Sequence, residues 1–372
     1  MKGWPLRKDG PTTMRIVVAM SGGVDSSVAA ALLSQQGHDV IGLSMQLYPS
    51  TSSGQSTDVT QPFGSCCTLD DLHDARRVAS ALGFPHYILN LERRFQDTVI
   101  SNFVHEYSAG RTPLPCAHCN SDLKFSTLLE RARGLGAEQV ATGHYARVER
   151  APGGTWLLKR SADPEKDQSY FLFSLTQDQL AGALFPVGHL SKSQVRAEAR
   201  RLGLGVAEKP DSQEICFVPD GGYAEFVERQ APALQRTGAI VDQRGETLRS
   251  HDGIHRFTVG QRKGLGLATG TPLYVLKIDA DSGNVTVGPR ERLERSTFTA
   301  SGVNWISVGP PGTWLDTAAQ IRHRHRPATG RVRAIEDGRA EFEFAEAQPA
   351  VTPGQAAVFY DGDVVVGGGW IE

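Results

Sequence analysis

The first indication of the fold is one stretch near the start of the chain, Arg15-Ile-Val-Val-Ala-Met-Ser-Gly-Gly-Val-Asp-Ser-Ser27. Its apolar run, residues 16–20, predicts a strand, and the Ala- and Leu-rich run over residues 28–36 predicts a helix. Gly22 and Gly23 lie between them, where the absence of side chains leaves room for an anion at the positive end of the helix. The stretch therefore predicts a strand, a phosphate-holding loop and a helix.

This loop differs from a Walker A loop, because no Gly-Lys-Ser/Thr follows its glycines. An acid, Asp25, stands where the lysine would be, and a carboxylate beside phosphate suits a site bridged by Mg²⁺. Ser21-Gly-Gly-Val-Asp-Ser-Ser27 is similar to the pyrophosphate loop (PP-loop) of enzymes that split ATP between its α and β phosphates and transfer AMP. An ordinary tight turn between a strand and a helix is the plain alternative.

Length and composition indicate two or three domains and no membrane span. The chain has 372 residues, and 39 basic residues against 41 acidic ones give a net charge of −2. Because this net charge is small, any RNA-binding surface must be a local patch. No apolar run is long enough to cross a membrane, and residues 1–13 look like a loose extension without a signal-peptide core. We therefore expect a cytoplasmic protein.

Residues 14–218 are expected to form an α/β domain with a doubly wound parallel sheet. A second apolar run, residues 39–47, completes a strand–helix–strand unit. Ligands of such sheets lie beyond the carboxyl ends of the strands, which places Met45 either against a nucleotide base or in the core. Gly143 follows a later strand at the same edge, where a glycine allows close approach to adenine or ribose.

The cysteine content argues against a secreted disulfide scaffold, because five cysteines in a chain of this length are few and odd in number. Cys66 and Cys67 stand at the expected start of a helix, where packing is the simplest role. Cys216 lies between Ile and Phe, which by itself suggests a buried core cysteine.

Cys116 and Cys119 form a Cys-x-x-Cys pair between two prolines and a predicted helix. Pro113 and Pro115 stiffen the backbone, so we expect the pair on a rigid loop that enters a helix over residues 121–133. Thiolates near a helix N-terminus have lowered pKa values and are better nucleophiles or metal ligands. The pair is therefore a candidate for chemistry.

Two further domains are expected after residue 218. Short strands between glycine turns replace the alternation of strands and helices from about Tyr223, which predicts a small mixed β-rich domain over residues 219–288 and an antiparallel β-barrel over residues 289–372. Two basic islands, residues 255–266 and 322–326, lie in these domains. Glycine beside Arg and Lys allows close approach to a phosphate backbone, so we expect RNA contacts there rather than only solvated surface charge.

Taken together, these stretches resemble the tRNA-specific 2-thiouridylases over nearly the whole chain after about residue 13. The PP-loop alone would fit several AMP-forming ligases and amidotransferases, whereas the full set of motifs is specific. It consists of Met20-Ser-Gly-Gly-Val-Asp-Ser-Ser27, Gly110-Arg-Thr-Pro113, Cys119-Asn120, Ala141-Thr-Gly-His-Tyr145, Lys166-Asp-Gln-Ser-Tyr-Phe171, Leu184-Phe-Pro-Val-Gly188, Gly260-Gln-Arg-Lys-Gly-Leu-Gly266 and Thr352-Pro-Gly-Gln355. The resemblance implies a PP-loop domain of the adenine nucleotide alpha hydrolase-like fold.

The implied activity is ATP-dependent 2-thiolation of the wobble uridine, U34, in the tRNAs for Glu, Gln and Lys. The uracil C2 oxygen is a poor leaving group, so ATP with Mg²⁺ adenylates it, and sulfur then replaces AMP. By resemblance, Cys216 carries a persulfide and Cys119 releases its sulfur by thiol–disulfide exchange, leaving a Cys119–Cys216 disulfide to be reduced. This role replaces the core interpretation of Cys216. The implied partners are tRNA and a cysteine desulfurase or sulfur-relay protein.

Binding positions of the family carry over to the matching residues of this chain. The ATP-contacting positions are Ala19, Met20, Ser21, Gly22, Gly23, Val24, Asp25, Ser26, Met45 and Gly143. The target base is implied to face Leu114, Pro115 and Cys116, and the tRNA contacts are Lys166, Asp167, Gln168, Arg324 and His325. His325 stands where tyrosine is common in the family, which puts base stacking at that position in doubt.

Cys116 departs from the family pattern, because many members have Asp in an Asp-x-x-Cys motif. Cys116, Cys119 and Cys216 would converge if the family geometry holds, and related thiolating enzymes use three cysteines to hold a [4Fe–4S] cluster with one iron open for sulfide. A cluster mechanism is therefore the alternative to the persulfide route. A zinc site would need a fourth ligand such as His118.

Two rival functions belong to other classes. A small-molecule ATP ligase of the argininosuccinate-synthase type also uses a Ser-Gly-Gly-x-Asp loop, but it does not need paired thiols or basic islands. A non-catalytic RNA-binding protein would not need an intact PP-loop. Loss of activity in Asp25→Ala with RNA binding retained would reject this last interpretation.

Overall fold

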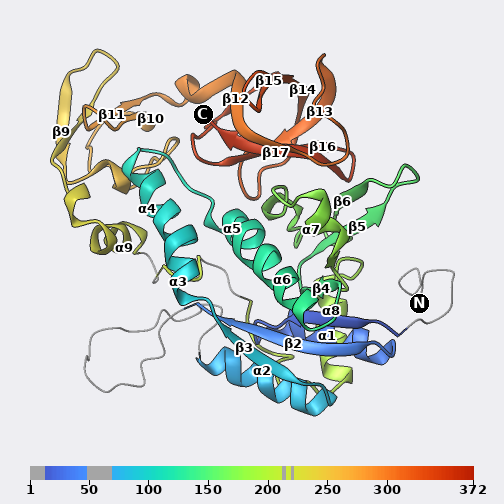
Figure 1. Cartoon of the computed structure of the whole chain (residues 1–372). Coiled ribbons are helices and arrows are strands. Elements are labelled where there is room, and N and C mark those ends of the chain that lie inside the picture. The colour runs from blue at the N-terminus through green and yellow to red at the C-terminus, as the bar shows by residue number, and fades with distance from the viewer. Residues whose placement is uncertain (1–12, 48–68, 212–214, 219–221) are drawn as a thin grey trace, which may run out of the picture. The chain divides into compact units, whose positions relative to one another are not determined.

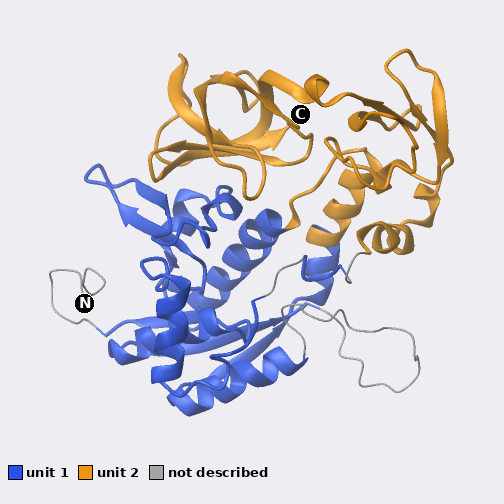
Figure 2. Ribbon diagram, turned by 180° about the vertical axis from the view of Figure 1, so that it is seen from behind, with its two compact units in different colours: residues 1–98, 116–220 blue, residues 99–115, 221–372 orange. Residues whose placement is uncertain are grey.

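The computed structural model describes residues 13–47, 69–211, 215–218 and 222–372. The chain forms two compact units, coloured separately in Figure 2: unit 1 is Met1–Thr98 with Cys116–Asp220, and unit 2 is Val99–Pro115 with Gly221–Glu372. The expected helix-start packing of Cys66 and Cys67 lies outside the described residues.

A five-stranded parallel sheet forms the centre of unit 1 (Figure 1), with the strand order β3-β2-β1-β4-β7. From β1 the chain builds outward through β2 to β3 and then crosses to β4 on the other side of β1. This confirms the predicted doubly wound sheet and places the reversal of strand order between β1 and β4, where such sheets bind ligands. The strands are β1 (Arg15–Ala19), β2 (Asp39–Gln46), β3 (His86–Asn90), β4 (Gln139–Ala141) and β7 (Ala183–Leu184).

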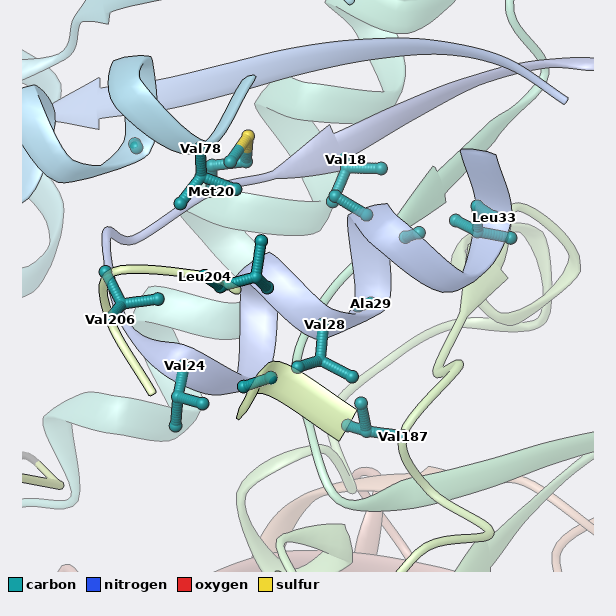
Figure 3. Packing of buried hydrophobic residues seen from close by; sticks show 14 of the residues in the cluster. Val18, Met20, Val24, Val28, Ala29, Leu33, Val78, Val187, Leu204 and Val206 are labelled. Carbon is teal, nitrogen blue, oxygen red and sulfur yellow. The ribbon is translucent and has the colours of Figure 1, made fainter. Parts of the chain in front are cut away.

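Helix α1 (Val24–Gln35) is buried on several sides, which explains why its sequence is apolar nearly all round. Figure 3 shows α1 between Val18 of β1 and the later segment that carries Val187, with Val28 on the side of Val187. The helix begins at Val24, so the predicted start at residue 28 was wrong. The small residues of the loop already form the first helical turn, which brings Asp25 into the helix.

The remaining helices of unit 1 pack around this sheet. Helices α2 and α8 share one apolar cluster with α1, whereas α6 packs against β1 and β4. A hairpin of β5 and β6 follows β4. The bounds are α2 (Leu69–Leu82), α3 (Glu92–Phe95), η1 (Gln96–Ile100), α5 (Pro115–His118), η2 (Cys119–Phe125), α6 (Ser126–Gly134), β5 (Ala146–Arg150), β6 (Trp156–Arg160), η3 (Ser169–Phe171), α7 (Gln177–Ala181) and α8 (Lys192–Arg201).

The predicted rigid loop around the Cys-x-x-Cys pair was wrong, because the helix already begins at Pro115. Proline is tolerated at the first helical position, where its missing N–H is not needed and its fixed φ suits the helix. Cys116 therefore lies in α5, and Cys119 is the first residue of η2, a π-helical segment that continues into α6.

Unit 2 contains a four-stranded mixed sheet with the order β10-β11-β8-β9, in which β8 and β11 run parallel. This confirms the small mixed domain in kind. A helix, α9, stands where only short strands were predicted; it packs against α4 through stacked rings of Tyr107 and Tyr223, 5.0 Å apart. The bounds are α4 (Ser101–Ser108), α9 (Tyr223–Gln230), η4 (Pro232–Leu234), β8 (Gly238–Val241), β9 (Thr247–His251), η5 (Ile254–Arg256), β10 (Tyr274–Asp279), β11 (Asn284–Gly288) and η6 (Arg290–Leu293).

The predicted C-terminal barrel is confirmed. Its six strands follow the order β12-β15-β14-β13-β16-β17, and pairing of β12 with β17 closes the ring. Phe342 lies at its centre, fully buried between Phe298 and Phe359, whose ring centroids are 5.3 and 5.7 Å away. The strands are β12 (Glu294–Trp305), β13 (Leu315–Gln320), β14 (Ala328–Ile335), β15 (Arg339–Pro349), β16 (Ala356–Asp361) and β17 (Val364–Ile371).

Phe342→Ala is expected to lower the free energy of unfolding of the barrel by about 3–5 kcal/mol, because it removes a buried ring and leaves a cavity. Denaturant unfolding followed by intrinsic fluorescence measures this change. Val308→Ala is the matched control, since Val308 is 39% exposed and its loss should leave the barrel transition within about 0.5 kcal/mol of the wild type. Equal effects of the two substitutions would contradict the packing described here.

Candidate functional site

The PP-loop lies at the carboxyl end of β1, where the strand order reverses. Gly22 has a φ of 74°, in the left-handed region, and a Cβ on this residue would lie 2.1 Å from the carbonyl oxygen of Asp71. The backbone N–H of Ser21 donates to Ser26 Oγ at 3.2 Å, which holds the loop against the first turn of α1. The first N–H groups of a helix have no intrahelical acceptor, so this turn can bind an anion.

Gly143 closes the site from the β4 side. A Cβ on this residue would lie 2.5 Å from the backbone nitrogen of Ser26 and 2.7 Å from the carbonyl carbon of Asp25. The close approach seen here is therefore to the PP-loop itself. The expected contact of Gly143 with adenine or ribose stays a prediction.

Asp25 is held by two groups that the sequence analysis did not assign. Lys192 Nζ, from the first residue of α8, lies 2.7 and 2.8 Å from the two carboxylate oxygens, and Tyr145 OH donates to Oδ1 at 2.8 Å. Burial and the charge of Asp25 raise the pKa of Tyr145, so it remains a donor. The Asp25 carboxylate is paired with the Lys192 ammonium in this arrangement, and carboxylate oxygens are also the ligands that Mg²⁺ prefers.

A second lysine, Lys209, connects the PP-loop to helix α2. Lys209 Nζ donates to the carbonyl oxygen of Gly22 at 3.1 Å and to carboxylate oxygens of Asp71 and Asp74, each at 2.6 Å. Burial alone would lower the pKa of Lys209, but the two hydrogen-bonded carboxylates outweigh it and raise the pKa. This ammonium therefore stays charged and fixes the loop that is expected to hold phosphate.

The other predicted nucleotide-site residues are mostly buried around the loop. Met20 and Val24 are 2% and 3% exposed, and Ser44 Oγ donates to the carbonyl oxygen of Met20 at 2.7 Å. Met45 is 7% exposed near the end of β2, which suits either of its expected uses, base contact or core packing. Ala19, the last residue of β1, is half-buried.

The three described cysteines belong to unit 1 and differ in exposure: Cys116 is exposed, Cys119 is buried and Cys216 is half-buried. The neighbour of Cys216, Phe217, packs edge-on against Phe95 of α3 with ring centroids 5.6 Å apart. Helix α3 also packs against η2, which begins with Cys119. The segments that carry Cys119 and Cys216 therefore share a neighbour.

The expected alternative of a metal site uses Cys116, Cys119 and Cys216, with a fourth ligand such as His118 for zinc. Within the described part of the chain, no three His, Cys, Asp or Glu side chains are arranged to hold a metal ion. His118 Nδ1 lies 3.0 Å from Asp122 Oδ2. Burial raises the pKa of Asp122, but hydrogen bonds from His118 and Ser121 outweigh it, and the net shift is downward.

The expected RNA-contacting segment 166–168 has partners within unit 1. Lys166 Nζ lies 2.8 Å from Asp211 Oδ2, and Asp167 Oδ2 lies 2.8 Å from Arg160 Nη1. Gln168 Oε1 accepts from the backbone N–H of Tyr145 at 2.9 Å. Gln168 therefore supports the backbone of the tyrosine that holds Asp25. The Lys166 side chain is 39% exposed, and its expected contact with RNA stays a prediction.

Arg324 and His325 lie in the turn between β13 and β14. The backbone N–H of His325 donates to the carbonyl oxygen of Arg322 at 3.1 Å, and Arg324 has a φ of 62°, a conformation that non-glycine residues rarely adopt. Burial lowers the pKa of His325, as does the charge of Arg322, so its ring favours the neutral form. Of the expected base-facing residues, Leu114 is 8% exposed and Pro115 begins α5.

Family models match three consecutive parts of the chain. The model described as "tRNA methyl transferase HUP domain" matches residues 14–220, "tRNA methyl transferase PRC-barrel domain" matches 224–289, and "Aminomethyltransferase beta-barrel domain" matches 295–371. None of the helices in the described ranges is both long and apolar enough to span a bilayer.

Proteins named "tRNA-specific 2-thiouridylase MnmA" are similar over nearly the full length. The one from Geotalea uraniireducens is 54% identical over 96% of this chain and 95% of its own length. The one from Geobacter metallireducens is 53% identical over 96% of each chain, and the one from Nitrobacter winogradskyi is 48% identical over 97% of this chain and 90% of its own.

Gly143→Ala is expected to weaken MgATP binding at least tenfold and to lower stability by about 1–3 kcal/mol, because the added methyl group must displace the first turn of α1. Isothermal titration calorimetry and thermal unfolding measure the two effects. Gly153→Ala is the matched control, since nothing lies within 4 Å of a Cβ at that position. Unchanged MgATP affinity in Gly143→Ala would show that the PP-loop does not hold the nucleotide.

Proposed function

This chain belongs to the tRNA-specific 2-thiouridylases, and we propose that it uses ATP to replace the C2 oxygen of the wobble uridine, U34, by sulfur in the tRNAs for Glu, Gln and Lys. The observation that carries this proposal is a PP-loop at the strand reversal of a unit that also carries Cys119 and Cys216. The matched models are described by methyl transfer, whereas relatives of about half identity are named for sulfur transfer. Paired thiols favour sulfur transfer.

ATP would supply the leaving group. In the proposed reaction the uracil C2 oxygen attacks the α-phosphate, pyrophosphate departs, and AMP leaves later when sulfur attacks C2. The glycines and the first turn of α1 suit the phosphates, and Asp25 would hold Mg²⁺. Lys209 contributes by fixing the carbonyl of Gly22, so the loop is preorganised before the nucleotide binds.

Sulfur would come from a persulfide on Cys216. The Cys119 thiolate attacks Cys216 Sγ, the terminal sulfur departs as hydrosulfide, and a Cys119–Cys216 disulfide remains; a two-electron reductant then restores both thiols. The shared neighbour of their two segments, α3, supports this pairing. A cysteine desulfurase or sulfur-relay protein would load Cys216 in the cytoplasm.

The alternative mechanism uses Cys116, Cys119 and Cys216 as ligands of a [4Fe–4S] cluster. The single observation in its favour is Cys116 itself, an exposed thiol on the helical turn before Cys119. In the persulfide mechanism Cys116 faces the target base with Leu114 and Pro115 and takes no part in electron transfer. The two mechanisms therefore differ in what they demand of this one residue.

The tRNA surface is best sought among basic side chains that lack a carboxylate partner, because such cations can neutralise phosphate. In the first basic island, Arg256 lies against Glu228, and buried His255 hydrogen-bonds the same carboxylate at 2.8 Å. Arg262 and Lys263 are exposed, and neither side chain has an ion-pair partner among the described residues; the carbonyl oxygen of Lys263 accepts from Gln261 Nε2 at 2.9 Å. Arg262 also lines a hollow of about 350 Å³ with Gly264, Gly266 and their neighbours.

The second island has the same character. Arg324 and Arg326 have no ion-pair partner in the described ranges, whereas Arg331 and Arg333, on the adjoining strand β14, are paired with Glu343 and Glu341. We therefore assign RNA phosphates to the turn at residues 322–326 and to the loop at residues 261–266, and not to the paired arginines of the barrel wall. The proposed tRNA contact of Lys166 rests on the family resemblance and not on this criterion, since Lys166 is paired with Asp211.

The proposed reaction is tested by nucleoside mass spectrometry of unmodified tRNA incubated anaerobically with the protein, ATP, Mg²⁺ and a cysteine desulfurase system. We expect ATP-dependent 2-thiouridine that survives iron chelation. Cys119→Ser and Cys216→Ser should each abolish the product while tRNA binding is retained, since each thiol has a required step. Cys116→Ser is the matched control and should keep most of the activity.

Other outcomes separate the alternatives. Loss of product in Cys116→Ser, together with a brown, iron-loaded wild type that accepts inorganic sulfide, would favour the cluster mechanism. Absence of 2-thiouridine with the cysteine desulfurase system and also with inorganic sulfide would favour the small-molecule ligase.

The RNA surface is tested with the double substitution Arg262→Gln with Lys263→Gln. We expect weaker tRNA binding and a decrease of the log Kd against log salt slope by about 1–2, one unit for each lost phosphate contact. The matched control is Arg331→Gln with Arg333→Gln, which removes two cations already paired with glutamates and should leave the slope unchanged. If the control lowers the slope as much as the test pair, the assignment by unpaired charge is wrong.

A further inference from the structure

One ammonium group lies between two carboxylates beside the PP-loop. Lys192 Nζ contacts both oxygens of Asp25, and it also lies 2.7 Å from Asp211 Oδ1. The Lys192 side chain is 12% exposed, so its ion pairs are largely shielded from solvent. If another cation binds one of these two carboxylates, the most stable position of the Lys192 ammonium therefore shifts toward the other carboxylate.

Asp211 is shared by three cations. Besides Lys192, it contacts Lys166 Nζ at 2.8 Å and Arg196 Nη2 at 3.0 Å. Burial raises the pKa of Asp211, but hydrogen bonds from Lys166 and Lys192 outweigh this and lower it to about 2. Asp211 is therefore charged at neutral pH, and Lys166, at 39% exposed against 23% for Arg196, is the most exposed of its three cations.

The segment that carries Lys166 is attached to the start of α8. Asp163 Oδ2 accepts from the backbone N–H of Lys192 at 2.9 Å, and its carbonyl oxygen accepts from the backbone N–H of Lys166 at 3.2 Å. The backbones of Lys166 and Lys192 thus both hydrogen-bond to Asp163, and their side chains both contact Asp211. Contacts within unit 1 therefore connect the Lys166 side chain to Lys192.

The Lys192 ammonium competes with Mg²⁺ for the carboxylate of Asp25. A divalent cation needs carboxylate oxygens, and both oxygens of Asp25 face the Lys192 ammonium. Because the ammonium and Mg²⁺ repel each other, Mg²⁺ binding at Asp25 favours the departure of Lys192 from this carboxylate. Asp211 is its other carboxylate partner, but Lys166 and Arg196 compete for the same oxygens.

We propose that Lys166 and Asp211 are positioning residues that couple RNA binding to MgATP binding: an RNA phosphate draws Lys166 away from Asp211, Asp211 then takes Lys192 fully, and Asp25 becomes available to Mg²⁺. The proposal rests on the proposed function, since it needs RNA and MgATP as ligands of one protein. By linkage, RNA and MgATP then tighten each other's binding by the same factor. MgATP then binds tightly chiefly when the RNA is bound.

The test is the affinity of the full-length protein for Mg²⁺ with a non-hydrolysable ATP analogue, measured by calorimetry with and without an unmodified tRNA transcript. In the wild type we expect tRNA to tighten nucleotide binding about tenfold, a size typical of coupled sites. Lys166→Gln should bind the nucleotide more tightly than the wild type without RNA, because Asp211 is already released, and tRNA should add little.

Two further variants keep the test decisive. Asp211→Asn removes the alternative partner of Lys192, so nucleotide binding should weaken, opposite in sign to Lys166→Gln. Lys159→Gln is the matched control, because it breaks an ion pair with Glu149 on the β5–β6 hairpin of the same unit without touching Asp211, and it should change neither affinity nor coupling. Circular dichroism checks that each variant is folded.

The outcomes distinguish this inference from the proposed function. If Lys166→Gln binds the nucleotide no more tightly than the wild type in the absence of RNA, or if Asp211→Asn does not weaken binding, the coupling is overturned even when the wild type forms 2-thiouridine. If both affinity shifts appear but no 2-thiouridine forms, the charge network stands and the proposed reaction fails.

Discussion

The close contact between the β4 loop and the first turn of α1 is the constraint on which the site depends. Gly143 has no side chain, so its backbone can lie against Asp25 and Ser26, and two residues later Tyr145 donates to the carboxylate of Asp25. This contact joins the two sides of the strand reversal. The charged groups of α8 and of residues 209–211 can then converge on a loop whose position is already fixed.

Basic residues divide into two kinds in this chain. Some neutralise carboxylates of the fold, as Lys209 does for Asp71 and Asp74, and their removal would take a cation away from largely buried acids. Others, such as Arg262 and Lys263, lack an ion-pair partner among the described residues and suit an external phosphate. Since the net charge is only −2, this division indicates an RNA surface better than the total count of basic residues does.

The sequence predicted the parallel sheet and the barrel because their patterns are local: apolar runs, glycine turns and alternation. It placed the start of the helix around Cys116 too late. Pro115 was expected to prevent a helix there, although proline suits a first helical position. It did not predict the Lys192–Asp25 and Lys192–Asp211 pairs. The first joins residues 167 positions apart, and a charged helix start carries no periodic signal for so distant a partner.

The π-helical segment η2 has a consequence for the direction of the thiols. A π turn holds one more residue than an α turn, so the seven residues Cys119–Phe125 rotate what precedes them relative to the packing face of α6. Rewinding the same residues as α-helix, without a change in length, would turn Cys116 and Cys119 around the axis by roughly 100°, the rotation of one α-helical residue. The width of a helical turn therefore sets which way the sulfur atoms face, independently of the loop that precedes them.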